Sequence, residues 1–314
     1  MKKTLWSVIL AVAVYTAIVF LSDAKEAGNA LSNLSFYWIP VFLCFSLVNY
    51  MLRFLKWNYF LGRVNVHIPW KESLSVFIAG FSMTVSPGKL GELLKCYLLK
   101  DRRNIPVSIT SPVVVAERIT DLISMILIAV IGLLLVRHRG AAIAVAAGIV
   151  FVVGVMIFLL WERAFGFLTN LLCRIKPVEK HRGSFMKFHG NVSSLLDIRS
   201  LLISVPLGIL SWGSEAIVLC LVAISLGIEP ELPLGLALLA HSAGTIAGAV
   251  SMIPGGLGLT EITIGAILTG VMSESSAAVT TLIMRFATLW FAVLLGVIVL
   301  GIIRRKAADC LPEK

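Results

Sequence analysis

The chain has 314 residues, of which 58% are hydrophobic and only 14% are charged, and its mean hydropathy is +0.96. An ordinary soluble domain carries about 25% charged residues, so this composition excludes a soluble globular protein. The net charge of +10 comes from basic residues in short segments between apolar runs. That pattern is typical of cytoplasmic loops beside anionic lipid headgroups, and we expect no nucleic-acid partner.

Six apolar segments are long enough to cross a bilayer, because a helix needs about 20 residues to span the hydrocarbon core. They run over Leu5–Ser22, Ser35–Leu55, Ile119–Val136, Ala141–Trp161, Leu201–Leu226 and Ala277–Ile303. The first could instead be a signal peptide, but it is longer than the usual apolar core of ~7–15 residues. We therefore interpret it as a membrane span, and the fold class as all-α integral membrane.

Two further apolar stretches are interrupted by proline and glycine. Trp70–Leu99 is broken at Ser86-Pro87-Gly88, and Leu232–Gly270 is broken at Pro254-Gly255-Gly256. Each half is only about 15 residues, or ~22 Å of helix, which is too short for a hydrocarbon core of ~30 Å. We expect two re-entrant helical hairpins, whose breaks must be covered by protein or by a watery cavity.

The loop charges fit a multi-pass protein of the cell membrane with both termini in the cytoplasm. The predicted inner segments are basic and comprise the N-terminus, Arg53–Lys71, Lys100–Arg103, Arg163–Arg199 and Arg304–Lys306. The predicted outer loops carry the acids Asp23, Glu26, Glu229, Glu231 and Glu274. Only Arg137-His138-Arg139 disagrees with the positive-inside rule.

The long inner connection Arg163–Arg199 has a helical apolar pattern. Its apolar residues recur at helical spacing: Phe165, Leu168, Leu171, Leu172 and Ile175. This pattern predicts an amphipathic helix on the inner surface, and the alternative is a solvated linker.

The two hairpins have matching sequences, which indicates an internal duplication. Ser82–Glu92 and Ser251–Glu261 both begin with Ser-Met, contain a Pro-Gly break and end in Glu. Further pairs at a nearly constant offset are Pro40 with Pro206, Asn49 with Glu215, and Arg118 with Arg285. Residues 1–139 and 140–314 would each run span, span, hairpin, span. An odd number of crossings inverts the second half, and we expect a site near the midplane where the halves meet.

Charged residues inside membrane segments mark the candidate site, because each costs about 2.5–3.5 kcal/mol to insert. They are Lys89, Glu92, Lys95, Glu117, Arg118, Asp121, Glu215, His241, Glu261 and Arg285. The second half-helix of each hairpin would begin deep in the membrane, with a partial positive charge and unpaired N–H groups. Two such helix N-termini, together with Lys89, Arg118 and Arg285, would form a pocket for an anion. Phosphate is the anion that we expect there.

The predicted substrate-binding residues are those at the hairpin tips and in the following spans. They are Lys89, Glu92, Arg118, Glu215, Glu261 and Arg285, with Ser86, Gly88, Gly255 and Gly256 at the breaks. The two glutamates of the hairpins could pair with the two arginines, or accept a proton or a cation. Alternatively, the breaks are only kinks and the Glu–Arg pairs only dock the halves.

Other features favour packing over chemistry. His241 more simply hydrogen-bonds a neighbouring helix, and Gly244 with Gly248 forms a GxxxG pattern for close helix packing. The five cysteines and five histidines are scattered, without a CxxC pair or an HExxH motif. We therefore expect no metal, no cofactor and no disulfide framework. Without a recognisable catalytic constellation, we also expect that the protein is not an enzyme.

Three motifs resemble a known family. They are Ser86–Glu92, Ala116–Asp121 and Ile253–Glu261, which resemble the lysylphosphatidylglycerol synthase transmembrane-domain family. This is the flippase-like membrane portion of bacterial multiple peptide resistance factors, and many members stand alone. The resemblance implies lipid translocation or a supporting role in the synthesis of lipids or lipid-linked glycans. The chain ends at Lys314, so we expect no lysyl-transfer domain.

The favoured function is a membrane lipid transporter, or flippase, that moves an anionic lipid between leaflets. The lipid would be a phospholipid or of the polyprenyl-phosphate type, with its headgroup at the hairpin tips and its tails in the bilayer. One alternative is a non-catalytic membrane partner of a lipid synthase or glycosyltransferase, docked through Arg163–Arg199. Another is an intramembrane enzyme acting on a lipid phosphate.

Overall fold

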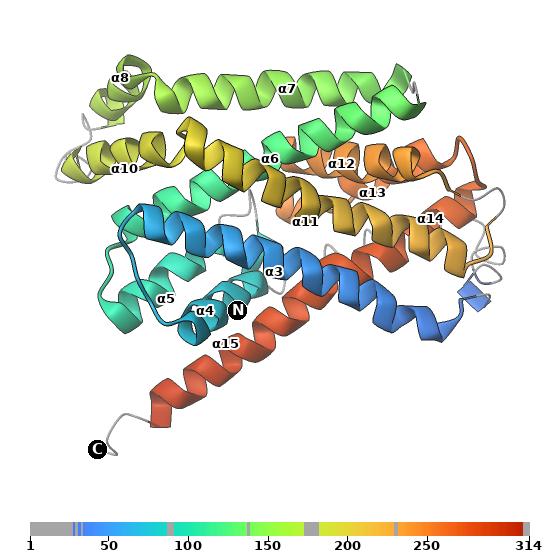
Figure 1. Cartoon of the computed structure of the whole chain (residues 1–314), viewed down its shortest axis with the longest axis horizontal. Coiled ribbons are helices and arrows are strands. Elements are labelled where there is room, and N and C mark those ends of the chain that lie inside the picture. Colours follow the sequence, from blue (N-terminus) through green and yellow to red (C-terminus); the bar gives the residue numbers. More distant parts are fainter. Residues whose placement is uncertain are drawn as a thin grey trace.

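The structure is a computed structural model that describes residues 28, 31–32, 34–86, 91–136, 139–172, 182–228 and 232–309. Within these ranges the chain forms helices and turns without a β-strand, as the predicted all-α class requires. Figure 1 shows α3 (Ile39–Arg63), α6 (Val107–Val136) and α11 (Ile198–Ser225) running lengthwise, with α15 (Phe291–Asp309) extending obliquely to the C-terminus.

Among the described residues, four helical segments are long and apolar enough to cross a membrane, and they coincide with four of the six predicted spans. They are Phe36–Arg63, Val107–Val136, Ile198–Ser225 and Glu274–Arg305. The first two are longer than predicted, because α3 continues past Leu55 and α6 begins well before Ile119. The predicted span Ala141–Trp161 corresponds to α7 (Arg139–Leu160), while Leu5–Ser22 lies outside the described residues.

The first broken segment is an antiparallel helical hairpin. It consists of α4 (Trp70–Gly80), a 3₁₀ turn at Phe81–Met83 and α5 (Leu94–Arg103). Arg103 at the end of α5 donates hydrogen bonds of 3.0 and 3.2 Å to the Glu72 carboxylate near the start of α4. The two ends of the segment therefore lie close together.

The second broken segment has the same form. It consists of α12 (Leu234–Val250), a 3₁₀ turn at Pro254–Gly256 and α13 (Leu259–Leu268). A Cβ on Gly244 would lie 2.6 Å from Ile264 Cγ1, and one on Gly248 would lie 2.2 Å from Thr260 Oγ1. The helices thus run antiparallel in close contact, which confirms the packing role predicted for the GxxxG glycines.

Each hairpin packs against the last span of the other half of the chain. α6 lies on α12, and α15 lies on α4 and its 3₁₀ turn. A Cβ on Gly132 of α6 would lie 2.7 Å from the Gly235 carbonyl oxygen, and one on Gly296 of α15 would lie 2.2 Å from the Ser82 nitrogen. This reciprocal packing is compatible with the expected division of the chain into two repeats at residue 139, and the division stays a prediction.

The last span is joined to α3 at a π-helical turn. This turn, Phe286–Trp290, connects α14 (Glu274–Arg285) to α15. A π turn disturbs the regular i→i−4 ladder, which frees carbonyl groups for other donors. Ser46 donates a 2.9 Å hydrogen bond to the Ala287 carbonyl, and Tyr50 donates one to the Thr288 carbonyl. α3 is thereby fixed beside the helix that carries Arg285.

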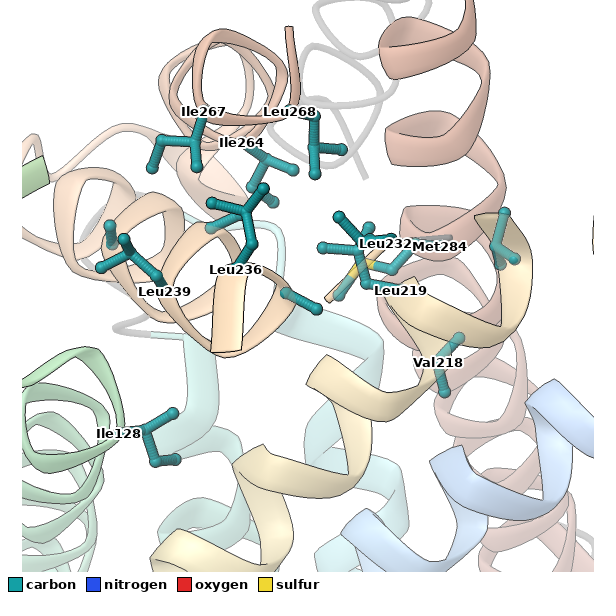
Figure 2. Packing of buried hydrophobic residues seen from close by; sticks show 14 of the residues in the cluster. Ile128, Val218, Leu219, Leu232, Leu236, Leu239, Ile264, Ile267, Leu268 and Met284 are labelled. Atoms are coloured by element: carbon teal, nitrogen blue, oxygen red, sulfur yellow. The ribbon is translucent and has the colours of Figure 1, made fainter. Parts of the chain in front are cut away.

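Two apolar clusters surround the hairpins. Figure 2 shows the cluster beside the second hairpin, where α6, α11, α12, α13 and α14 contribute side chains. Its labelled members Leu219, Leu236, Ile264 and Met284 are at most 2% exposed. The cluster beside the first hairpin includes Phe54, Trp57, Phe60, Phe77 and Cys96. The broken helices are therefore enclosed by packed protein, as their unsatisfied backbone groups require.

The inner connection differs from the single surface helix predicted for it. It contains α8 (Glu162–Leu172) and α10 (Arg182–Leu195), and α10 packs against α6 with Val192 and Leu195 fully buried. Phe165 of α8 is buried, but Leu171 is exposed. The side chains of Leu168, Leu172 and Ile175 lie outside the described part of the chain. A solvated linker is excluded for α10.

Candidate functional site

The two breaks meet at a polar cavity of about 50 Å³. A Cβ on Gly255 of the second break would lie 3.3 Å from Val85 Cγ1 at the first break. The charged residues that line the cavity are Arg53, Glu92, Glu215 and Arg285. By volume the cavity accommodates a few water molecules or a group of similar size. Glu92, Glu215 and Arg285 are among the predicted site residues, and their role in binding stays a prediction.

Glu92 is the centre of a buried ion-pair network. Its carboxylate lies 3.2 Å from Arg118 and 3.7 Å from Arg53. Lys95 lies 3.9 Å from Glu92 and donates a 2.7 Å hydrogen bond to Glu117 of α6. The pairing of Glu92 with Arg118 that the sequence left open is thus present.

Asp121 extends this network to a second lysine. Its carboxylate lies 3.0 Å from Arg118 and also pairs with Lys56 of α3. With every group ionised, four basic side chains face three acidic ones. The members are Arg53, Lys56, Lys95 and Arg118 against Glu92, Glu117 and Asp121. Because a buried charge without a counter-charge is costly, this excess favours a nearby anion, and Glu215 is a carboxylate that lines the same cavity as Arg53.

Arg53 and Thr84 place hydrogen-bond donors at the polar cavity. Arg53 is only 7% exposed, and its guanidinium carbon lies 5.3 Å from the Phe81 ring centre and 5.2 Å from that of Trp212. Arg53 Nε and Thr84 Oγ1 have no hydrogen-bond partner among the described residues. A buried polar group left unpaired costs about 1–3 kcal/mol. Both residues line the polar cavity.

The second hairpin carries the equivalent Glu–Arg pair in a different setting. Arg285 donates hydrogen bonds of 2.7 Å to Glu261 and 2.8 Å to the Gly255 carbonyl. Glu261 also accepts a 2.7 Å hydrogen bond from the Gly258 N–H. Gly255 and Gly256 have φ values of 64° and 68°, which only glycine adopts without strain. Here the ion pair holds the backbone of the break in its turn.

Glu215 of α11 lies beside a histidine of the second hairpin. Its Oε2 lies 3.6 Å from Nε2 of His241 on α12. Both residues are buried, and Glu215 lines the polar cavity. His241 therefore faces a carboxylate of the neighbouring helix α11, but 3.6 Å is longer than a hydrogen bond, and the hydrogen bond predicted for His241 stays a prediction.

A second, apolar cavity of about 290 Å³ adjoins the polar one. It lies mainly among apolar side chains of α6, α7 and α12, such as Val115, Met125 and Phe151. Five residues line both cavities: Trp212, Thr245, Gly248, Ala249 and Gly256. Arg118 and Asp121 are its charged lining residues. A polar and an apolar compartment thus share one wall.

The structure separates the predicted site residues. Glu92, Glu215, Arg285, Gly255 and Gly256 line the polar cavity, whereas Arg118 lines the apolar one. Glu261 lines neither of these two cavities and accepts a hydrogen bond from Arg285. Ser86 accepts a 2.7 Å hydrogen bond from the Gly91 N–H. Lys89 and Gly88 lie outside the described residues.

Arg53 and Lys56 correct the sequence interpretation. Both were placed in an inner loop, but they lie within α3 and are 7% and 1% exposed. The mistake came from ending the span at Leu55 and counting basic residues as loop charges. The aromatic residues that continue through Phe60 were the available signal for a longer buried helix. Within the described ranges, no group of three or more His, Cys, Asp or Glu side chains is placed to hold a metal ion.

Comparison with known proteins agrees with this architecture. The UPF0104 membrane protein PH1989 of Pyrococcus horikoshii is 24% identical over 323 residues, which cover 94% of this chain and 96% of that protein. The UPF0104 membrane protein MJ1078 of Methanocaldococcus jannaschii is 27% identical over 228 residues, which cover 72% of this chain and 95% of that protein. The family model of the lysylphosphatidylglycerol synthase TM region matches residues 8–296. With its apolar spans, the chain is a multi-pass membrane protein that belongs to the lysylphosphatidylglycerol synthase TM region family.

Proposed function

We propose that the protein moves a lipid with an anionic phosphate headgroup between the leaflets of the cell membrane. The observation that carries this proposal is the buried pair of donors, Arg53 Nε and Thr84 Oγ1, at the cavity where the two breaks meet. The adjacent network carries one more basic than acidic side chain. Guanidinium groups bind phosphate oxygens through charge-assisted hydrogen bonds.

The apolar cavity supports a lipid over a free phosphate. It adjoins the polar cavity through a wall of small residues, including Gly248, Ala249 and Gly256. An apolar cavity does not hold water well, whereas a hydrocarbon chain gains contacts there. With the phosphate at Arg53, part of one chain would lie in this cavity while the rest stays in the bilayer.

The reciprocal packing supports alternating access. Each hairpin is held by the last span of the other half, so rocking of the halves would move both breaks together around the site. In this proposal the hairpins re-enter from opposite sides and both termini are cytoplasmic. Cysteine substituted at Glu274 should then react with an external membrane-impermeant reagent, whereas cysteine at Arg63 or Arg182 should not. External labelling at Arg63 would contradict this orientation.

The function is tested with purified protein in liposomes that contain fluorescent phosphatidylglycerol. A membrane-impermeant quencher measures the leaflet exchange of the lipid. We expect Arg53→Gln to reduce exchange to the protein-free rate, and Thr84→Val to slow it. Arg53→Lys should recover part of the rate, because lysine keeps the charge without the planar fork.

Arg305→Gln is the matched control, because it removes an exposed arginine of α15 and should leave exchange unchanged. Fluorescent phosphatidylcholine controls for headgroup charge, and thermal melting in detergent controls for folding. Wild-type exchange by a well-folded Arg53→Gln variant would contradict the proposed site. Release of phosphate from a lipid phosphate would favour an enzyme instead.

A further inference from the structure

The Glu215–His241 pair is an ionisable pair at the wall of the polar cavity that phosphate binding does not use. Glu215 comes from α11 and is 7% exposed, and His241 comes from α12 and is 2% exposed. Their facing atoms, Oε2 and Nε2, lie 3.6 Å apart. Ionisable side chains inside membrane segments are rare and commonly belong to ion or proton pathways.

We infer that the Glu215–His241 pair carries a proton together with the anionic lipid, which makes the protein a proton-coupled transporter. This inference rests on the proposed lipid transport. The reason lies in the charges of the cavity, where two arginines face two glutamates. A phosphate that enters beside ionised Glu215 meets a like charge at short range. A proton on Glu215 removes this repulsion, so proton and phosphate each strengthen the binding of the other.

The surrounding charges are less suited to this role. Arg118, Asp121, Glu261 and Arg285, on the helices around the pair, are held in ion pairs between carboxylates and arginine or lysine. A proton on one of those carboxylates would weaken its hold on a buried cation that cannot lose its charge easily. Glu215 differs because its partner His241 can itself lose a proton near neutral pH.

The α3 side of the cavity completes the surroundings of the pair. Tyr50 and Arg53 of α3 line the same cavity, as does Glu92. Arg53 remains positive throughout, so it can hold the phosphate while the proton resides on the Glu215–His241 pair. The site would therefore bind a phosphate through α3 and a proton on the adjoining helices α11 and α12.

The charge balance follows directly for a phosphodiester lipid. Its headgroup carries one negative charge, and one proton bound by the Glu215–His241 pair neutralises it. The proton enters from the water on one side and leaves to the water on the other, and no covalent bond changes. Transport of this lipid is then electroneutral, which avoids carrying a net charge through a low-dielectric region.

The test uses liposomes that contain the full chain, fluorescent phosphatidylglycerol and an internal pH-sensitive dye. With the outside made acidic, the wild-type protein should move the lipid from the outer to the inner leaflet several-fold faster than without a gradient. The dye should report acidification of the interior that depends on the lipid. An imposed membrane potential should have no effect.

Glu215→Gln should lose the acceleration by the gradient, and His241→Gln should weaken it. Glu274→Gln, at an exposed glutamate, is the matched control and should behave as wild type. Wild-type exchange that ignores the gradient, or a full response in Glu215→Gln, overturns the coupling while lipid transport stands. No movement of phosphatidylglycerol by wild-type protein under either condition contradicts the proposed function itself. The wild-type measurements decide the matter even where a variant fails to fold.

Discussion

The two hairpins use the same Glu–Arg pair in opposite electrostatic settings. At the first hairpin, Glu92 and Arg118 are 3.2 Å apart within a network that has one uncompensated basic side chain. At the second, Glu261 and Arg285 are 2.7 Å apart and balance one another. Backbone groups of the second break complete that pair, through the Gly255 carbonyl and the Gly258 N–H.

The two Glu–Arg pairs therefore have different roles, although their sequence motifs match. The second pair is closed by short hydrogen bonds and fixes a turn with left-handed glycines. The first pair is loose: Arg118 is 21% exposed, and Glu92 is shared by three basic groups. Under the predicted duplication the two pairs would share an origin; the second is suited to holding backbone, and we propose that the first responds to a ligand.

The largest expected effect is on stability at the second hairpin. Arg285→Gln leaves Glu261 buried without its cation and removes a donor to Gly255. Removing one partner of a buried ion pair costs about 3–5 kcal/mol, so we expect a large loss of thermal stability in detergent. The double variant with Glu261→Gln should recover most of it. A stable single variant would show that the second pair is not a clamp.

The next effect concerns the glycine contacts by which each hairpin meets the opposite half. Gly296→Ala places a Cβ 2.2 Å from the Ser82 nitrogen, and Gly132→Ala places one 2.7 Å from the Gly235 oxygen. Overpacking costs about 1–3 kcal/mol, and the shorter contact should cost more. Gly154→Ala is the control, since nothing lies within 4 Å of its added Cβ. Equal melting temperatures for all three variants would contradict close reciprocal packing.

Much of the fold could be predicted because membrane helices are specified by local composition. Four spans and both breaks follow from apolar length and from Pro-Gly interruptions, which need no tertiary knowledge. Helix ends were less predictable, because charged residues inside α3 and the start of α6 interrupt the apolar signal. Within Arg163–Arg199 the predicted helix is present as α8, whereas α10 was not predicted, because its packing on α6 is a tertiary property.

The candidate site was only partly predictable. Pairing of Arg118 and Arg285 with the hairpin glutamates was one of the alternatives that the sequence left open, and their different surroundings depend on long-range contacts. Arg53 was missed because a basic residue near the predicted end of a span looks like a loop charge. The apolar cavity had no sequence signature, since it is formed by small and aliphatic residues from helices far apart in the chain.

A smaller effect is expected from Arg118→Gln, the counterpart of the Arg285 change. Glu92 retains Arg53 and Lys95 nearby, and Asp121 retains Lys56. We expect a stability loss of about 1 kcal/mol and slower lipid exchange, because the variant removes the excess positive charge. Thermal melting and the exchange assay measure the two effects. A loss as large as that of Arg285→Gln would make the two pairs equivalent after all.

The smallest effect concerns the N-terminal ends of α3 and α11, which differ in side-chain capping. Trp38 gives α3 no side-chain cap, whereas Asp197 caps α11 by accepting a 2.9 Å hydrogen bond from the Ser200 N–H. Arg63 at the end of α3 also donates to Asp197, at 3.0 and 3.2 Å. The Arg63 and Ser200 hydrogen bonds lower the pKa of Asp197 to about 2, from an ordinary value of about 3.9.

Asp197→Asn keeps a capping oxygen and removes the charge, so the ion pair alone is lost. The pair is partly exposed, and such pairs contribute roughly 0.2–1 kcal/mol. Because the pKa is lowered by folding, this stabilisation is complete above about pH 4 and disappears as the pH falls through about 2. The melting-temperature difference between wild type and Asp197→Asn should therefore be small but measurable at neutral pH and should vanish in acid.

Asp197→Ala also removes the cap, which is worth ~1 kcal/mol, and should remain less stable than Asp197→Asn in acid. A difference between wild type and Asp197→Asn that is independent of pH would show that Arg63 does not stabilise the charged form of this cap.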